Sequence, residues 1–72
     1  MSRYAVIIEG NGDKSYSAFV PGLPGCVAAG DSIEEVERLI REAAQLHVDS
    51  LRAHGEPVPT PGTAAVTEIE VE

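Results

Sequence analysis

The N-terminal third of the chain carries apolar residues with the two-residue period of β-strands. Residues 3–9 (RYAVIIE) are mostly apolar on both faces, which predicts a central strand, and residues 15–20 (SYSAFV) continue the extended pattern. The GNGD sequence at 10–13 is rich in residues that tolerate positive φ, which indicates a tight turn. We therefore expect the two apolar segments to form a β-hairpin.

Prolines and glycines interrupt the pattern at residues 21–25 (PGLPG), where no regular structure is expected. The short apolar segment at 26–30 (CVAAG) fits a third strand that pairs back on the hairpin. Residues 65–71 (AVTEIEV) alternate again. One face of this last segment is largely charged, which predicts an edge strand whose charges oppose edge-to-edge aggregation.

Between these strands the apolar period lengthens to that of an amphipathic α-helix. Ser32 followed by Glu35 matches the capping box that opens helices, and Gly55 is a natural terminator. We therefore expect a helix that ends at about His54. The residues expected on its apolar side are Ile33, Val36, Ile40, Ala43, Ala44, His47 and Leu51, with Leu39 and Leu46 at the margins.

The predicted order is β-β-β-α-β, an α+β fold in which one helix covers one face of a four-stranded sheet. Alternate prolines at residues 56–62 (EPVPTPG) predict a stiff, extended connection after the helix. A right-handed crossover would then place the last strand beside the first and parallel to it. The other sheet face carries apolar residues with no helix to cover them, which favours a second subunit or a partner there.

The length of 72 residues predicts a single domain over residues 1–72. A chain of this size buries only about 60% of its unfolded surface. Aromatic residues make up 4% of the sequence, so the core must be built from Val, Ile, Leu and Ala. We therefore expect a homodimer or a larger homo-oligomer.

The charge balance bears on possible partners. Twelve acidic and five basic residues give a formal net charge of -7, which argues against direct binding of nucleic acid. A basic protein partner is electrostatically plausible, and solubility alone is the alternative explanation. On the helix, Glu34–Arg38 and Glu37–Arg41 have the i,i+4 spacing of stabilising ion pairs.

The sequence also bears on localisation. No apolar run approaches the roughly 20 residues needed to cross a membrane, and the N-terminus lacks the features of a secretory signal. A cytoplasmic protein is therefore expected.

Neither the histidines nor the cysteine predict a reactive site. His47 and His54 are seven residues apart with no further metal ligand on that side, and a helix-end histidine is expected to bond a carbonyl. Cys26 has no partner for a disulfide and is expected to be a buried small hydrophobe. The glutamates have the outward pattern of a solvated surface rather than of converging nuclease carboxylates. We expect no metal, no cofactor and no enzymatic activity.

A spaced Pro-Gly signature resembles that of the HicB-like antitoxin family. The family pattern runs P-x-L-P-G-C, then G-[DT/DS]-x-x-E-A at a helix start, then G-x-x-[IV]-P-x-P. The matching positions are Pro21, Leu23, Pro24, Gly25, Cys26, Gly30, Asp31, Ser32, Glu35, Gly55, Pro59 and Pro61. Val36 stands where the family usually has Ala, and Gly22 where an acidic residue is more common.

The resemblance implies a partial RNase-H-like fold without a catalytic role. Family members typically neutralise a HicA toxin, a small basic mRNA-cleaving protein, and many carry a C-terminal DNA-binding domain that we do not expect in this chain. The resemblance therefore favours an antitoxin that occludes a HicA-type toxin. The alternative is a solitary HicB-like homo-oligomer of structural or regulatory role with no toxin partner.

For an antitoxin with a basic partner, the expected contacts are acids that project into solvent. The candidate partner-binding residues are Glu34, Glu42 and Asp49 on the helix and Glu68 and Glu70 on the last strand.

Overall fold

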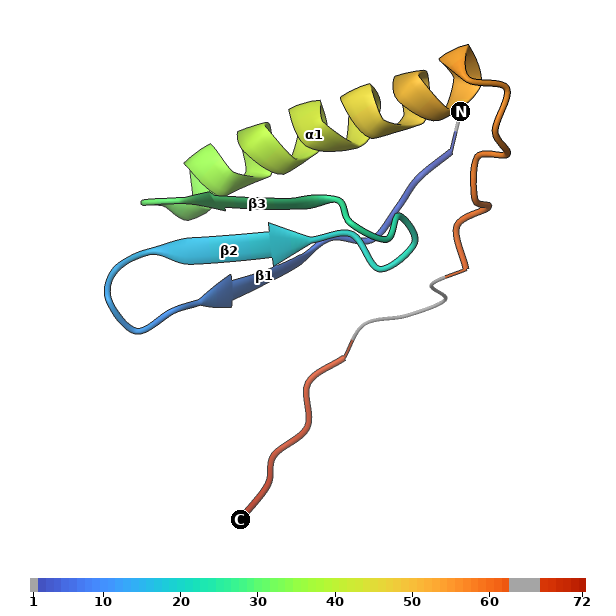
Figure 1. The fold of residues 1–72 in the computed structure, drawn as a ribbon. Helices are drawn as coiled ribbons and strands as arrows, with labels where there is room; N and C mark the ends of the chain where they lie inside the picture. The colour runs from blue at the N-terminus through green and yellow to red at the C-terminus, as the bar shows by residue number, and fades with distance from the viewer. Residues whose placement is uncertain (1, 63–66) are drawn as a thin grey trace.

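The computed structural model describes residues 2–62 and 67–72 of the chain. Its elements are the strands β1 (Ile7–Gly10), β2 (Tyr16–Phe19) and β3 (Val27–Gly30), followed by the helix α1 (Ile33–Ala53). The strands form an antiparallel sheet in the order β1-β2-β3, and α1 lies over one face of this sheet (Figure 1). The fold is therefore α+β, with the three N-terminal strands and the helix in the predicted order.

The predicted hairpin is confirmed, and its turn is held by local hydrogen bonds. Asn11 N–H donates to the Ser15 carbonyl at 3.0 Å, and Ser15 N–H donates to the Asp13 carboxylate at 3.1 Å. Gly12 and Lys14 both adopt positive φ, at 83° and 68°. Gly12 takes that conformation at no steric cost, as the turn sequence predicted.

The first strand is shorter than expected, because residues 3–6 lie outside the ladder. Ile7 pairs with Phe19 in β2, so the same register would place Ala5 opposite Pro21. Proline has no N–H to donate to a ladder, and the chain turns away into the Pro-Gly loop at that point. The prolines that end β2 therefore also limit β1.

Both ends of α1 follow from the local sequence. The Ser32 hydroxyl accepts a hydrogen bond from Glu35 N–H at 3.1 Å, which confirms the predicted N-cap. At the other end, Gly55 has φ +68°, its N–H donates to Arg52 O at 3.1 Å, and Glu56 N–H donates to Leu51 O at 2.8 Å. This pair of bonds is a Schellman motif, which needs the left-handed conformation that Gly55 provides.

The core lies between α1 and the sheet. Its buried members are Ala18, Val20, Leu23, Cys26, Val36, Ile40 and Val48. Val48 was not among the expected apolar positions, and Ile33, which was, is 45% exposed. Ile33 is the first residue of the helix, and helical side chains lean toward the N-terminus. Its side chain therefore projects beyond the part of α1 that packs on the sheet.

Tyr4 ties the N-terminal segment to the connection that follows the helix. Its hydroxyl donates to the Pro59 carbonyl, and Val58 packs against the core. The Tyr4 ring also lies against Gly22, where an added Cβ would come within 2.9 Å of it. The extended connection at 56–62 is therefore held along the N-terminal segment rather than free in solvent.

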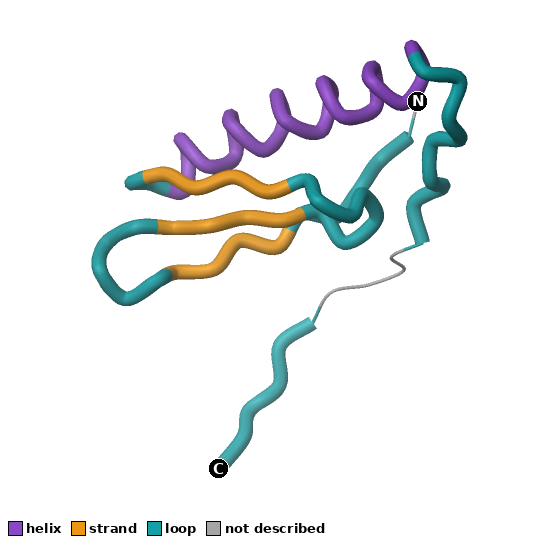
Figure 2. Tube along the Cα trace, viewed as in Figure 1, coloured by secondary structure: helices purple, strands orange, loops and turns teal. Residues whose placement is uncertain are grey.

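The expected fourth strand does not form in the described part of its range. Residues 67–72 belong to no strand and extend away from the sheet (Figure 2), while residues 65 and 66 lie outside the described residues. Ile69 and Val71 are 81% and 83% exposed, so the apolar face of this segment packs on nothing in a single copy of the chain. Within the described residues the sheet has three strands, and β1 has a neighbour on one side only.

Candidate partner-binding surfaces

Three of the five candidate contact acids share one outer face of α1. Glu34, Glu42 and Asp49 are all exposed. At about 100° per residue they fall within roughly 80° of one another around the helix axis. Glu42 lies 3.8 Å from the Arg38 guanidinium, and Asp49 accepts a hydrogen bond from the Gln45 amide at 2.9 Å. Arg38 and Arg52 fall in the same angular range, and Arg38 is paired with Glu42, so this face carries charges of both signs with an excess of one acid.

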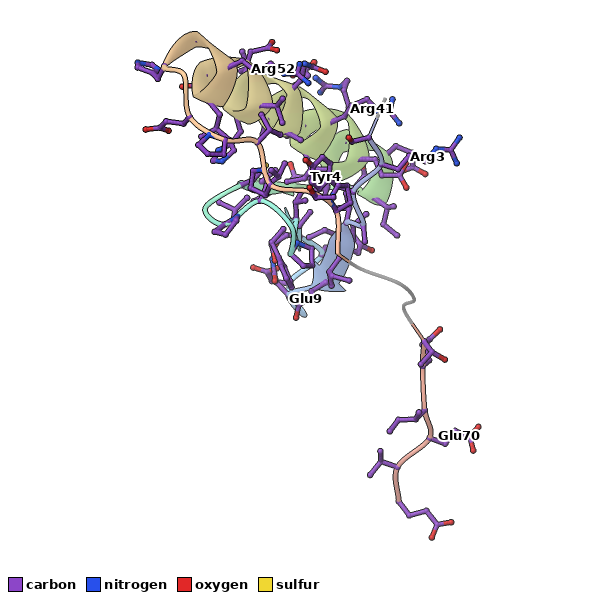
Figure 3. The ribbon with its side chains drawn as sticks, turned by 90° about the vertical axis from the view of Figure 1, so that its right-hand side faces the viewer. Arg3, Tyr4, Glu9, Arg41, Arg52 and Glu70 are labelled. Atoms are coloured by element: carbon purple, nitrogen blue, oxygen red, sulfur yellow. The ribbon has the colours of Figure 1, made fainter. Side chains whose placement is uncertain are left out.

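The other two candidate acids lie elsewhere. Glu68 and Glu70 are exposed on the C-terminal segment, and Figure 3 shows Glu70 far from the helix. The structure therefore brings together the three helix acids but does not bring the two tail acids to them.

The expected ion pairs of the helix are replaced by a different one. Arg38 pairs with Glu42 rather than with Glu34. Across residues 2–62 and 67–72, this is the only ion pair with a nitrogen–oxygen distance within 4.0 Å, so Glu37–Arg41 is not formed either. Exposed pairs of this kind contribute little to stability, so the exchange of partners has little energetic consequence.

A groove of about 750 Å³ runs between α1 and the N-terminal segment that leads into β1. It exists because α1 packs on β3 and β2 and leaves β1 uncovered. Val6 and Ile8 contribute to it from the strand side, and Ile40 and Val48 from the helix. The groove therefore has an apolar lining that nothing in the described chain fills.

Arginines surround this groove. Arg3 reaches it from the N-terminal segment, and Arg41 and Arg52 from α1, so three of the five basic residues of the chain line one groove (Figure 3). None of the three forms an ion pair within the described residues. The sequence predicts that Arg41 pairs with Glu37 and does not predict this groove. The eleven-residue spacing of Arg41 and Arg52 is about three helical turns and indicates that both lie on one side of α1, but it does not indicate what lies beside them.

The sheet face opposite α1 carries a second apolar feature. The register aligns Ile7, Phe19 and Val27 in one row across the three strands. Phe19 is 39% exposed and Val27 is 66% exposed. This row confirms that the face predicted to lack a covering helix is apolar and open in the single chain.

Cys26 and His54 both lie in surroundings that suit a structural role. Cys26 is buried among core residues, and desolvation raises the pKa of its thiol above the ordinary value. The His54 Nδ1 lies 2.7 Å from the Ser50 carbonyl oxygen, as expected of a helix-end histidine. In the part of the chain that the structure describes, no three His, Cys, Asp or Glu side chains are grouped to hold a metal ion.

The same described residues include no helix that is long and apolar enough to cross a membrane.

Comparison with known proteins agrees with the family resemblance of the Pro-Gly signature. A family model described as the HicB-like antitoxin of bacterial toxin-antitoxin systems matches residues 4–72. A UPF0150 protein of Synechocystis sp. is 45% identical over 57 residues, which cover 79% of this chain and 72% of that protein. A UPF0150 protein of Thermoplasma acidophilum is 35% identical over 65 residues, covering 90% and 94%, and one of Helicobacter pylori is 37% identical over 59 residues, covering 82% of each.

The chain belongs to the HicB-like antitoxin family.

Proposed function

We propose that this protein is an antitoxin that neutralises a small basic HicA-type mRNA-cleaving toxin by covering it, without chemistry of its own. The family supports a toxin-antitoxin role. The observation that carries the proposal further is the outer face of α1, where the exposed acids Glu34, Glu42 and Asp49 outnumber Arg38 and Arg52 of the same side. A rigid helix that presents acids along one face is suited to a basic partner, because fixed charges steer a complementary surface toward it.

The proposed action is occlusion in the cytoplasm, where a mRNA-cleaving toxin would act. Exposed acids accelerate the encounter, and apolar contact then sets how long the complex lasts. The open row of Ile7, Phe19 and Val27 offers such apolar contact area. We further propose that the bound form completes the four-stranded, partial RNase-H-like sheet, since β1 retains a free edge.

A second candidate function is supported by a different observation. The apolar row and the unfilled groove are features of a surface that another copy could cover. A solitary homo-oligomer of structural or regulatory role would use them without any toxin. The two candidates differ in whether a specific basic partner exists.

The distinguishing experiment measures binding to the product of a neighbouring reading frame that encodes a small basic protein. A histone serves as the control, because a chain of net charge -7 attracts basic proteins in general. We expect tighter binding to the neighbouring product than to the histone, with the difference retained at high salt. Equal affinity for both proteins would contradict the antitoxin role and favour the solitary oligomer.

A further inference from the structure

The groove beside β1 and the C-terminal segment 67–72 have complementary chemistry. The groove is apolar inside, through residues such as Val6, Ile8 and Ile40, and is lined by Arg3, Arg41 and Arg52. The segment TEIEVE alternates apolar residues with glutamates. In an extended conformation its apolar side chains share one face and its glutamates the other.

We propose that the C-terminal segment of one copy docks in this groove of a second copy, and that the exchange is mutual. Ile69 and Val71 would cover the apolar lining, and Glu68 and Glu70 would lie near the arginines. Docking would remove from water two side chains that are 81% and 83% exposed in the single chain. A twofold arrangement makes the contact twice, once in each direction.

Charge distribution supports this choice of occupant. The chain is strongly acidic, yet three of its five basic residues line this one groove. No carboxylate of the described residues comes within 4.0 Å of those three arginines. Glu37 is the one acid that lines the groove, against three arginines. A segment with a glutamate at every second position adds further negative charges in the spacing of an extended chain.

The path of the chain favours a second copy over the same copy. The connection is fixed beside the groove by the Tyr4–Pro59 hydrogen bond and by the packing of Val58. From there the described C-terminal residues extend away from the body (Figures 1 and 3). The segment is thus presented outward, where a neighbouring copy can take it up, while β1 keeps a free edge beside the groove.

Two charge-reversal variants test the exchange. The groove variant carries Arg41→Glu and Arg52→Glu, and the tail variant carries Glu68→Arg and Glu70→Arg. All four positions are exposed and outside the core, so helix content measured by circular dichroism should be retained. Arg38→Glu with Lys14→Glu is the matched control for the groove variant, because it reverses two basic residues away from the groove.

Mass in solution is then measured by light scattering at high micromolar concentration. We expect the wild type and the control to be dimers and each variant alone to be a monomer. An equal mixture of the two variants should return to a dimer, because a normal tail then meets a normal groove and a reversed tail meets a reversed groove.

Several results would overturn the exchange. A monomeric wild type would do so, and so would a mixture that stays monomeric, since docking of each segment on its own copy is not restored by mixing. Variants that remain dimeric alone would place the dimer contact elsewhere, as on the Ile7, Phe19 and Val27 row. No toxin takes part in this experiment, so its outcome is independent of the antitoxin role.

Discussion

Hydrogen bonds to single side chains stabilise the hairpin turn and the helix N-terminus of this protein. Asp13 is the clearest case, because its carboxylate accepts hydrogen bonds from both the hydroxyl and the backbone N–H of Ser15. These two bonds hold the pKa of Asp13 below its ordinary value. They favour the ionised form, so the turn gains support from them only while the carboxylate is charged.

Removing the hydroxyl should return the Asp13 titration toward normal. In Ser15→Ala we expect the pKa of Asp13 to rise, because the hydroxyl is the larger cause of its lowering. Because the pKa of Asp13 is lowered in the folded state, the ionised carboxylate stabilises the fold at pH values above its ordinary pKa. This stabilisation is lost as the pH falls through the pKa of the folded state. NMR titration of the Asp13 side-chain carbon in the variant and in the wild type measures the shift. An unchanged titration would show that the hydroxyl does not hold the carboxylate.

The elements of the fold differ in how far local sequence determines them. Ser32 and Gly55 specify the ends of α1 through contacts within a few residues, and the structure confirms both caps. The other half of the capping box differs, because the Glu35 carboxylate accepts a hydrogen bond from Asp31 N–H at 3.5 Å rather than from Ser32 N–H. The length of β1 instead depends on Pro21, which lies in another segment. The register that brings Pro21 opposite β1 cannot be deduced from the local sequence of either segment. Non-local pairing is also why the strand expected at 65–71 could not be placed from its alternation alone.

The N-cap of α1 gives a stability prediction for this element. Ser32→Ala should lower the free energy of unfolding by about 1 kcal/mol, because Glu35 N–H loses its acceptor. Ser50→Ala is the matched control, since only the backbone carbonyl of Ser50 has a partner described for it. Urea denaturation followed by circular dichroism measures both variants. Equal midpoints for the two would mean that Ser32 does not cap the helix.

At the scale of the whole molecule, the distribution of charge is more informative than its sum. The net charge of -7 was compatible with a basic partner but did not show where on the surface it would bind. The fold places Glu34, Glu42 and Asp49 on the outer side of α1 beside Arg38, and places Arg41 and Arg52 where this side borders the groove. The groove could not be predicted from sequence, because it depends on which strands the helix covers. The acidic face could, because helical spacing alone determines it.

The acidic face gives a kinetic prediction for the proposed complex. Glu42→Gln with Asp49→Asn should slow association with the neighbouring basic protein severalfold and change dissociation little, because exposed charges act mainly on the encounter. Glu9→Gln with Glu56→Gln removes the same charge from exposed sites elsewhere and serves as control. Surface plasmon resonance at two salt concentrations measures both rates. Equal slowing by the two pairs would assign the effect to net charge rather than to this face.

Neutralisation of a mRNA-cleaving toxin by this protein can be measured by titrating the ribonuclease activity of the toxin. The purified basic protein from the neighbouring reading frame is incubated with an mRNA substrate while this chain is added in steps. Polyglutamate of equal total charge controls for nonspecific attraction. We predict that cleavage falls to background at a fixed molar ratio of the two proteins, and that polyglutamate does not reproduce this. Cleavage that persists when this chain is in excess, or that polyglutamate suppresses equally, would contradict the account.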